Sequence, residues 1–305
     1  MTGVCLQWRL KCIRGLVVWV TIGVLPMVSH SNPNRVGRTS PEREMFSQSQ
    51  AYEHFMGRWS RLLAPLLVRF ADVQGRSSVL DVGSGTGALA SAIAAAVPSC
   101  QVTGVDPAAD YVAYAQAHVP NGRVRFAVGD AQQLRFADGT FDQTLSLLVL
   151  NFIPDPKKAL REMIRVTRSG GVVAAAVWDY GQGMEMLRIF WDEAVALDPG
   201  IDRRDERHMP YCRKGELEAL WRENDLQNVQ ERPLTIQLDF SSFEDYWIPF
   251  LAGQGPAGNY AASLGQDQLA QLQLRLRRRL VGKGQDRPFK LQARAWAVRG
   301  IVRPH

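Results

Sequence analysis

The stretch that decides the fold is residues 79–90, VLDVGSGTGALA. A short β-branched run ends in an acid, alternating glycines follow, and small apolar residues then begin a helical pattern. Glycine lets a ligand approach bare backbone, because it has no Cβ and tolerates positive φ angles. The stretch therefore predicts a strand, a ligand-binding loop and a helix, and leaves open which ligand the loop holds.

Strand and helix patterns alternate on both sides of this loop. Apolar periodicity predicts helices over residues 51–70, 88–97, 107–119, 156–168, 214–226 and 268–280. It predicts strands over 77–82, 101–106, 123–130, 141–150, 172–179, 233–240 and 289–300, and an aromatic, then turn-rich segment over 243–260. Such alternation is typical of right-handed βαβ units and a parallel sheet. The last two strands depart from it and predict an antiparallel edge.

The composition is that of a globular protein. The chain has 305 residues, of which 46% are hydrophobic and 22% charged, enough for one large α/β domain or two small ones. The net charge of +6 divides into +4 over residues 1–45, −7 over the middle and +9 over 275–305. A nucleic-acid footprint would line one groove or face, so this division argues against such a partner. We expect Arg275, Arg277, Arg278 and Arg279 to lie on a solvated helix face.

The cysteines and the N-terminal segment give information on the cellular compartment of the protein. Cys5, Cys12, Cys100 and Cys212 form no C-x-x-C pair, so no metal site is predicted. Residues 1–45 are expected to be a disordered leader, whose apolar stretch 16–28 fits a signal-peptide core and is short for a membrane span. One interpretation is a signal or anchor; the other, which we favour, is natural translation from near Met45 and a cytoplasmic protein. Residues 46–305 then form one domain, with substrate-side insertions at about 180–213 and 240–288.

The glycine loop matches the dinucleotide pattern G-x-G-x-x-G/A, and Asp106 follows it at about the spacing of a ribose-binding acid. Taken alone, this admits NAD. Asp81, just before the loop, would repel a pyrophosphate and attract an ammonium group. Asp130, at the end of the third predicted strand, suits an exocyclic amine. The ligand so described has an amine, a ribose and an adenine but no pyrophosphate, as in S-adenosylmethionine (SAM).

Four motifs in order resemble those of class I SAM-dependent methyltransferases: VLDVGSGTGALA, VTGVDPAADYVAYAQ, VGDAQQLRFADGTFD and LLVLNFIPDPKKALREMIRVTRSGGVV. The likeness is good over residues 51–180 and holds only in outline over 181–300. It is nearest to the small-molecule group that includes the ubiquinone and menaquinone C-methyltransferases. The resemblance implies an α/β, Rossmann-like fold with helices on both faces of a seven-stranded, mostly parallel sheet. The implied strand order is 3-2-1-4-5-7-6, with the last strand antiparallel.

The same resemblance implies which residues hold the cofactor. The methionine moiety is assigned to Asp81, Gly83, Ser84, Gly85 and Gly87. Asp106 is assigned to the ribose hydroxyls, Pro107 to a face of the adenine, Asp130 and Ala131 to its edge, and Leu147 to the sulfonium region.

Further candidates lie outside these motifs. Tyr52 and Arg58 precede the core and are candidates for a lid over the cofactor, with Arg58 pairing with the methionine carboxylate; the alternative is an ordinary amphipathic helix. Asn151, just past the fourth strand, is a candidate acceptor contact or a turn residue. His208 and Tyr211 are weak candidates for a catalytic base, because a histidine has a suitable pKa but most loop histidines are merely solvated.

The sequence thus predicts an enzyme that transfers a methyl group from SAM to a small, apolar or aromatic acceptor. This reaction needs alignment and exclusion of water, and a base only where the acceptor loses a proton, so no universal catalytic residue is expected. Two alternatives are an NAD(P)-dependent oxidoreductase and a SAM-binding protein without catalysis. Most aromatic residues of the second half are expected to be core: Trp191, Trp221, Phe243, Tyr246, Trp247 and Phe250.

Overall fold

The structure is a computed structural model that describes residues 12–13, 16–17, 49–119 and 121–303. The chain divides into two units, residues 1–40 and 41–305. In the first unit, β1 (Cys12–Ile13) and β2 (Leu16–Val17) pair antiparallel. Most of the apolar stretch 16–28 lies outside the described residues, so the leader stays a prediction.

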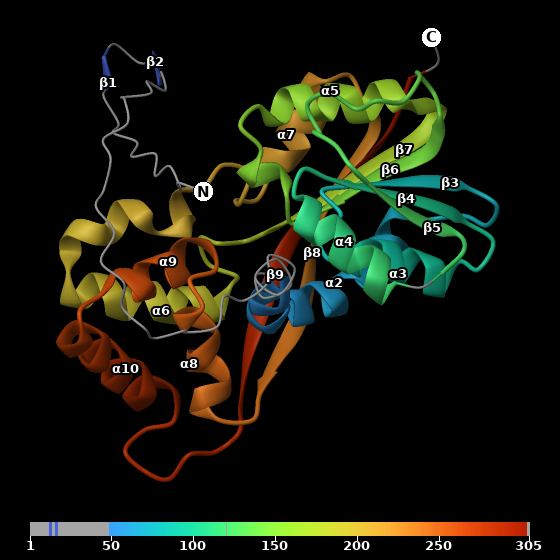
Figure 1. Ribbon diagram of the computed structural model, residues 1–305. Coiled ribbons are helices and arrows are strands. Elements are labelled where there is room, and N and C mark those ends of the chain that lie inside the picture. Colours follow the sequence, from blue (N-terminus) through green and yellow to red (C-terminus); the bar gives the residue numbers. More distant parts are fainter. Residues whose placement is uncertain (1–11, 14–15, 18–48, 120, 304–305) are drawn as a thin grey trace, which may run out of the picture. The chain divides into compact units, whose positions relative to one another are not determined.

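A seven-stranded sheet forms the centre of the second unit (Figure 1). Its strands are β3 (Ser78–Val82), β4 (Gln101–Asp106), β5 (Val124–Val128), β6 (Phe141–Leu147), β7 (Thr167–Trp178), β8 (Gln227–Phe240) and β9 (Phe289–Ile301). They follow the order β5-β4-β3-β6-β7-β9-β8, and β9 runs antiparallel to both of its neighbours while the other pairs are parallel. Counted from β3, this is the order 3-2-1-4-5-7-6. The predicted fold and its antiparallel edge are confirmed.

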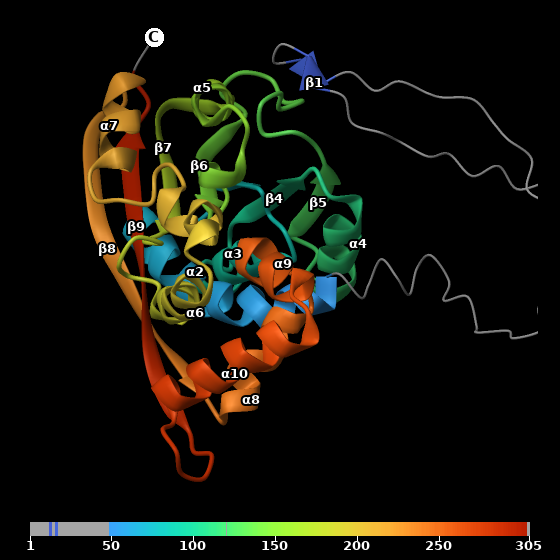
Figure 2. The same ribbon diagram turned by 90° about the vertical axis from the view of Figure 1, so that its left-hand side faces the viewer.

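Helices cover both faces of the sheet (Figures 1 and 2). In Figure 1, α5 (Pro156–Val166) and α7 (Glu216–Glu223) lie above it, and α2 (Arg58–Ala71), α3 (Ala88–Ala96) and α4 (Ala109–His118) lie below. Beyond the carboxyl ends of the central strands gather α6 (Glu185–Leu197), α8 (Phe243–Leu251), α9 (Gly255–Ser263) and α10 (Gln266–Leu280). The shorter turns are η1 (Glu53–Gly57), η2 (Leu150–Phe152), η3 (Pro199–Arg204) and η4 (Glu206–His208). None of the helices in the described ranges is long and apolar enough to cross a bilayer.

The core explains the apolar strand patterns. Strands β6 and β7 are buried along most of their length, because helices cover both of their faces. The core continues into α6, α7 and α8, where every aromatic residue expected to be core is buried: Trp191, Trp221, Phe243, Tyr246, Trp247 and Phe250. That prediction is confirmed.

The prediction of a turn-rich end to the segment 243–260 is wrong, because α8 and α9 occupy most of it. Pro256 stands in the first turn of α9, where its missing N–H removes no helical hydrogen bond. Gly253 and Gly255, with φ of 71° and 66°, form the corner between the two helices. The glycines and the proline therefore mark the start of a helix.

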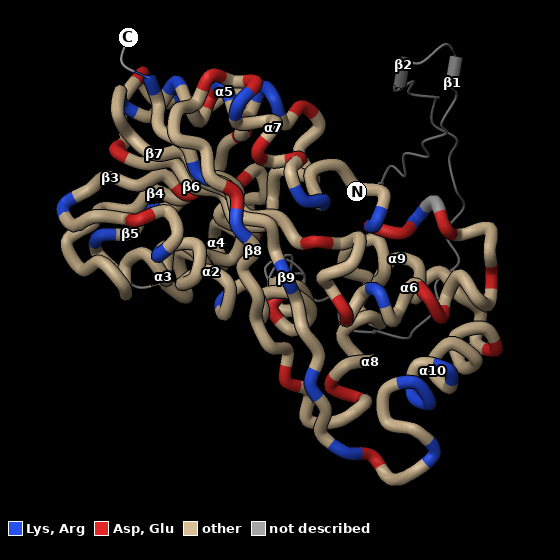
Figure 3. Tube along the Cα trace, turned by 180° about the vertical axis from the view of Figure 1, so that it is seen from behind, with Lys and Arg blue, Asp and Glu red and all other residues tan. Residues whose placement is uncertain are grey.

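The arginines of α10 lie on a solvated face, as expected: Arg275, Arg278 and Arg279 are exposed and Arg277 is half-buried. Arg275 and Arg279 pair with Glu193 of α6 at 2.8 and 3.2 Å, and Arg279 pairs with Asp192 at 2.9 Å. Basic and acidic residues are interspersed over this region (Figure 3). Two of the four arginines are thus paired with acids of α6, and Arg277 lies 3.7 Å from Glu244 and from Asp286.

Candidate functional site

The glycine loop follows β3, an interior strand of the sheet between β4 and β6. Gly83, Gly85 and Gly87 have φ of 74°, 49° and 91°, a region that glycine enters without strain. The N–H groups of Gly83 and Ser84 both donate to the carbonyl of Val105, at 2.7 and 3.0 Å. These bonds hold the loop against the end of β4, at the edge where doubly wound sheets bind ligands.

A cavity of about 170 Å³ opens beside this loop. The structure brings most of the predicted cofactor residues into its wall: Tyr52, Asp81, Gly83, Ser84, Gly85, Asp106 and Leu147. Gly87 lies behind the wall, where a Cβ would come within 2.9 Å of Val119 Cγ2. The absence of a side chain at Gly87 therefore lets the start of α3 pack closely against the neighbouring elements.

Asp106 is held at the cavity by the backbone. Its Oδ2 accepts the N–H of Gly85 and its Oδ1 accepts the N–H of Ala108, both at 2.9 Å. Burial raises the pKa of the carboxyl, and these two hydrogen bonds oppose the rise. Asp106 therefore joins the glycine loop to the start of the next helix while it faces the cavity.

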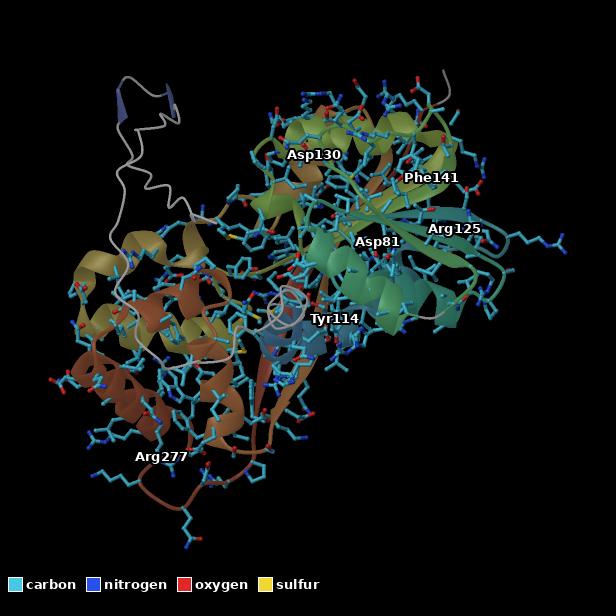
Figure 4. The ribbon with its side chains drawn as sticks, viewed as in Figure 1. Asp81, Tyr114, Arg125, Asp130, Phe141 and Arg277 are labelled. Atoms are coloured by element: carbon cyan, nitrogen blue, oxygen red, sulfur yellow. The ribbon has the colours of Figure 1, made fainter. Side chains whose placement is uncertain are left out.

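Asp81 is fully buried at the end of β3 (Figure 4). Its Oδ2 accepts the N–H of Ala90 at 3.1 Å, whereas its Oδ1 has no hydrogen-bond partner among the described residues. Burial raises the pKa of this carboxyl to about 7, and the Asp106 charge adds to the rise. The hydroxyl of Ser84 is also buried without a partner in the described part of the chain. Buried polar atoms of this kind at a cavity indicate a ligand that completes their hydrogen bonds.

Three predicted adenine contacts, Pro107, Asp130 and Ala131, do not line the cavity. Asp130 is exposed beyond β5 (Figure 4), and its carboxylate accepts the backbone and side-chain N–H groups of Gln132 at 2.8 and 3.2 Å. These hydrogen bonds hold the pKa of Asp130 below its usual value. The N–H of Gly129 donates to the carbonyl of Asp106 at 3.0 Å, so the segment reaches the same sheet edge. Its contact with adenine stays a prediction.

The proposed role of Arg58 is wrong. Its guanidinium donates to the Asp245 carboxylate at 2.6 Å and to the Asp245 carbonyl at 3.1 Å. It also stacks over the rings of Trp59 and Phe240, at 4.1 and 5.0 Å from their centroids. Arg58 therefore ties α2 to α8 and does not face the cavity.

Two of the three candidate catalytic residues lie away from the cavity, and one lies beside it. His208 is exposed on the surface, where its Nε2 lies 3.1 Å from Asp202 Oδ2. Tyr211 lines a separate hollow with Lys157. Neither residue therefore belongs to the cofactor cavity. Asn151 is buried and follows the lining residue Val149 closely. Its Nδ2 lies 3.3 Å from Met209 Sδ, and its Oδ1 has no partner among the described residues. Only Asn151 thus stays an acceptor-side candidate.

The cavity also contains residues that the sequence did not single out: Ser60, Thr86, Tyr111, Val149 and Phe152. The ring of Tyr111 lies 5.5 Å from that of Tyr52, so the two tyrosines flank one side of the cavity. A signal for Tyr111 was present, because it stands in the first turn of the helix that follows the ribose-type acid. Val149 and Phe152 follow β6 and continue the apolar wall begun by Leu147.

The donor set fits SAM better than a dinucleotide. The cavity wall contains two carboxylates and, among the described residues, no lysine, arginine or histidine. A pyrophosphate there would meet repulsion, whereas an ammonium and a sulfonium would meet attraction. A Cβ on Gly85 would meet no atom within 4 Å, so the loop leaves space for a ligand against its backbone.

Comparisons with known proteins agree with this assignment. A family model described as a methyltransferase domain matches residues 80–175. The 2-methyl-6-phytyl-1,4-hydroquinone methyltransferase of Synechocystis sp. is 28% identical over 182 residues, which cover 58% of this chain and 54% of that protein. The malonyl-[acyl-carrier protein] O-methyltransferase of Geobacter sulfurreducens is 31% identical, over 59% of this chain and 68% of that one. The chain spans about half the length of several curated relatives that it matches.

The crystal structure of the YcgJ protein from Bacillus subtilis has the same fold. It superposes with a TM-score of 0.53 at 20% identity, covering 79% of this chain and 98% of that one. The sheet order, the glycine loop between Asp81 and Asp106, and these sequence matches lead to one conclusion. The chain belongs to the class I SAM-dependent methyltransferase family.

Proposed function

We propose that this protein transfers the methyl group of SAM to a small, uncharged, apolar or aromatic acceptor. The observation that carries the proposal is the wall of the cavity, which is acidic on the cofactor side and apolar on the other. Bound SAM supplies an electrophilic methyl group with a good leaving group. The chain's own part is to hold the cofactor and exclude water from the reacting atoms.

The cofactor side is built from residues already in place. Asp81 and the loop from Gly83 to Gly85 would hold the methionine moiety, and Asp106 would accept hydrogen bonds from the ribose hydroxyls. The unpaired Oδ1 of Asp81 is suited to an ammonium donor. Leu147, Leu148 and Val149 present an apolar surface beside these acids, which would keep water from the sulfonium.

The acceptor side favours an uncharged molecule. The relatives named above include a 2-methyl-6-phytyl-1,4-hydroquinone methyltransferase and a malonyl-[acyl-carrier protein] O-methyltransferase. No cation of the described residues lines the cavity, so a carboxylate acceptor would lack a charge partner. The unpaired Oδ1 of buried Asn151 would accept a hydrogen bond from a hydroxyl. A quinol or phenol matches both features.

A screen with isotopically labelled SAM tests the acceptor. We expect label in a quinol or phenol and little in a fatty acid or a malonyl thioester, because only the first two donate a hydrogen bond without carrying a charge. Preferential labelling of a carboxylate would contradict the proposal. SAM binding without transfer to any acceptor would support the alternative of a binding protein, and nicotinamide binding would support an oxidoreductase.

SAM affinity is expected to depend on pH through Asp81. Burial places the pKa of this carboxyl at about 7 without ligand, and a cationic ligand favours its ionised form. Below pH 7 binding must therefore release a proton, so affinity falls as the pH falls. At pH 6 we expect roughly tenfold weaker binding than at pH 8. Calorimetry in buffers of different ionisation enthalpy measures the released proton.

The matched control for this pH dependence is Asp81→Asn, which preserves the shape and removes the titration. Its SAM affinity should be lower at pH 8 and nearly flat from pH 6 to 8. An unchanged slope in the variant would assign the dependence to another group, such as Asp106, whose pKa burial also raises.

A cytoplasmic location and the absence of a nucleic-acid partner stay predictions. They rest on the need for SAM and on the distribution of charge along the sequence.

A further inference from the structure

A buried carboxylate outside the family motifs connects two walls of the cofactor cavity. Glu53 begins the π-helical turn η1 and is only 7% exposed. The hydroxyl of Thr86, inside the glycine loop, donates to Glu53 Oε1, and the guanidinium of Arg61 pairs with Oε2. We refer to Glu53, Thr86 and Arg61 together as the Glu53 bridge.

The chain leaves room for this carboxylate at Gly57. A Cβ on Gly57 would lie 2.5 Å from Glu53 Oε1 and 2.6 Å from Glu53 Cδ. Gly57 has an ordinary helical φ of −58°, so its backbone does not require glycine. The requirement is steric, because the Glu53 side chain occupies the place of a side chain at Gly57. Single π-helical turns of this kind are frequent at functional sites.

The elements that the bridge joins both contact the cofactor cavity. Tyr52, the residue before Glu53, lines the cavity and lies 5.5 Å from the ring of Tyr111. Thr86 lines it from the glycine loop. Glu53 itself is not among the lining residues, so it acts through its neighbours. Without the bridge, the turn that carries Tyr52 loses a direct side-chain tie to the loop.

We propose that Glu53 is a positioning residue for the cofactor, which fixes Tyr52 and the glycine loop at the spacing that SAM requires. The proposal rests on SAM being the ligand of the cavity. It deepens the proposed function by adding a residue that contacts neither the cofactor nor the acceptor.

The first test separates cofactor affinity from stability. Calorimetry with SAM is expected to show about tenfold weaker binding for Glu53→Ala and for Thr86→Val, since each removes one end of a charge-assisted hydrogen bond. Glu53→Gln keeps an oxygen that accepts from Thr86, so its affinity should fall between those of the parent and Glu53→Ala. The double variant Glu53→Ala/Thr86→Val should be no weaker than either single variant, because the two residues act through one bond.

The second test uses the steric requirement at Gly57. Glycine to alanine within a helix normally stabilises a protein by about 0.5–1 kcal/mol. Here the added Cβ must shift the flexible end of the Glu53 side chain, so Gly57→Ala should weaken SAM binding, by no more than Glu53→Ala does. Normal affinity in Gly57→Ala would contradict the bridge.

Glu231→Ala is the matched control. The Glu231 carboxylate likewise ties two elements, accepting the N–H groups of Gly215 and Glu218 at 2.7 and 3.2 Å, but it does not line the cavity. This variant should melt at a lower temperature and bind SAM normally. If the parent binds no SAM, the proposed function fails. If the parent binds and the bridge variants bind equally well, or lose affinity only in proportion to their melting temperatures, the positioning role alone is overturned.

Discussion

Asp106→Ala is expected to weaken SAM binding by roughly a hundredfold or more, the largest effect of any single side-chain truncation at this site. The carboxylate would lose its bonds to the ribose hydroxyls, and each bond to a charged group contributes about 1.5–3 kcal/mol. The truncation also frees the N–H groups of Gly85 and Ala108, which Asp106 holds at 2.9 Å. Calorimetry with SAM at neutral pH measures the change.

Asp110→Ala is the control for this loss. Asp110 stands in the first turn of the same helix, α4, but does not line the cavity. The Asp110→Ala variant should bind SAM almost as the parent does. This result would show that the loss of affinity in Asp106→Ala is not a general effect of removing negative charge. Equal affinities for Asp106→Ala and the parent would remove Asp106 from the site.

Gly83→Ala is expected to abolish measurable SAM binding and to lower the melting temperature by several degrees. A Cβ there would lie 2.5 and 2.6 Å from the two methyl carbons of Val149, and the φ of 74° strains any L side chain. Relief of the collision must move either the loop or Val149, and both line the cavity. Thermal unfolding and calorimetry report the two consequences, with an expected stability loss of about 2 kcal/mol or more.

Variants at two other glycines separate the two causes of this effect, the strain of a positive φ and the collision with Val149. Gly85 has φ 49°, and a Cβ there would meet no atom within 4 Å. Gly85→Ala should therefore lose SAM affinity with a smaller loss of stability. Gly282, beyond α10, has φ 79° and equally open surroundings. Gly282→Ala measures the cost of the positive φ alone and should leave binding intact. A melting temperature for Gly83→Ala no lower than that of Gly282→Ala would contradict the collision with Val149.

The sequence was most informative where function depends on contiguous residues. The glycine loop, Asp81 and Asp106 each combine a residue type with a position at the end of an apolar run, and this local pattern predicted both the sheet and the cofactor. The antiparallel edge was predicted because the last two strands depart from the alternation of strands and helices. Such features are encoded within a few residues of one another, so a single sequence displays them.

The errors arose where a residue's role depends on a distant partner. Arg58 has the chemistry to bind a carboxylate, but the carboxylate that it binds belongs to Asp245, 187 residues further along the chain. Glu53 was not predicted as a site residue, because nothing near it in sequence shows that Thr86 will lie beside it. Local patterns misled at Gly255 and Pro256, where residues that usually mark a turn open α9 instead. Pairings of this kind are created by the fold and have no local signature.

The pairing of β8 with β9 has a consequence for how such an enzyme diversifies. Phe240 and Phe289 are opposite one another at the end of this ladder, and their rings stack 5.1 Å apart. Everything from residue 241 to residue 288, including α8, α9 and α10, therefore leaves and re-enters the sheet at a single point. Exchanging this segment would therefore alter a single connection of the backbone. A replacement would have to match the faces of α2 and α6 that α8 and α10 now contact.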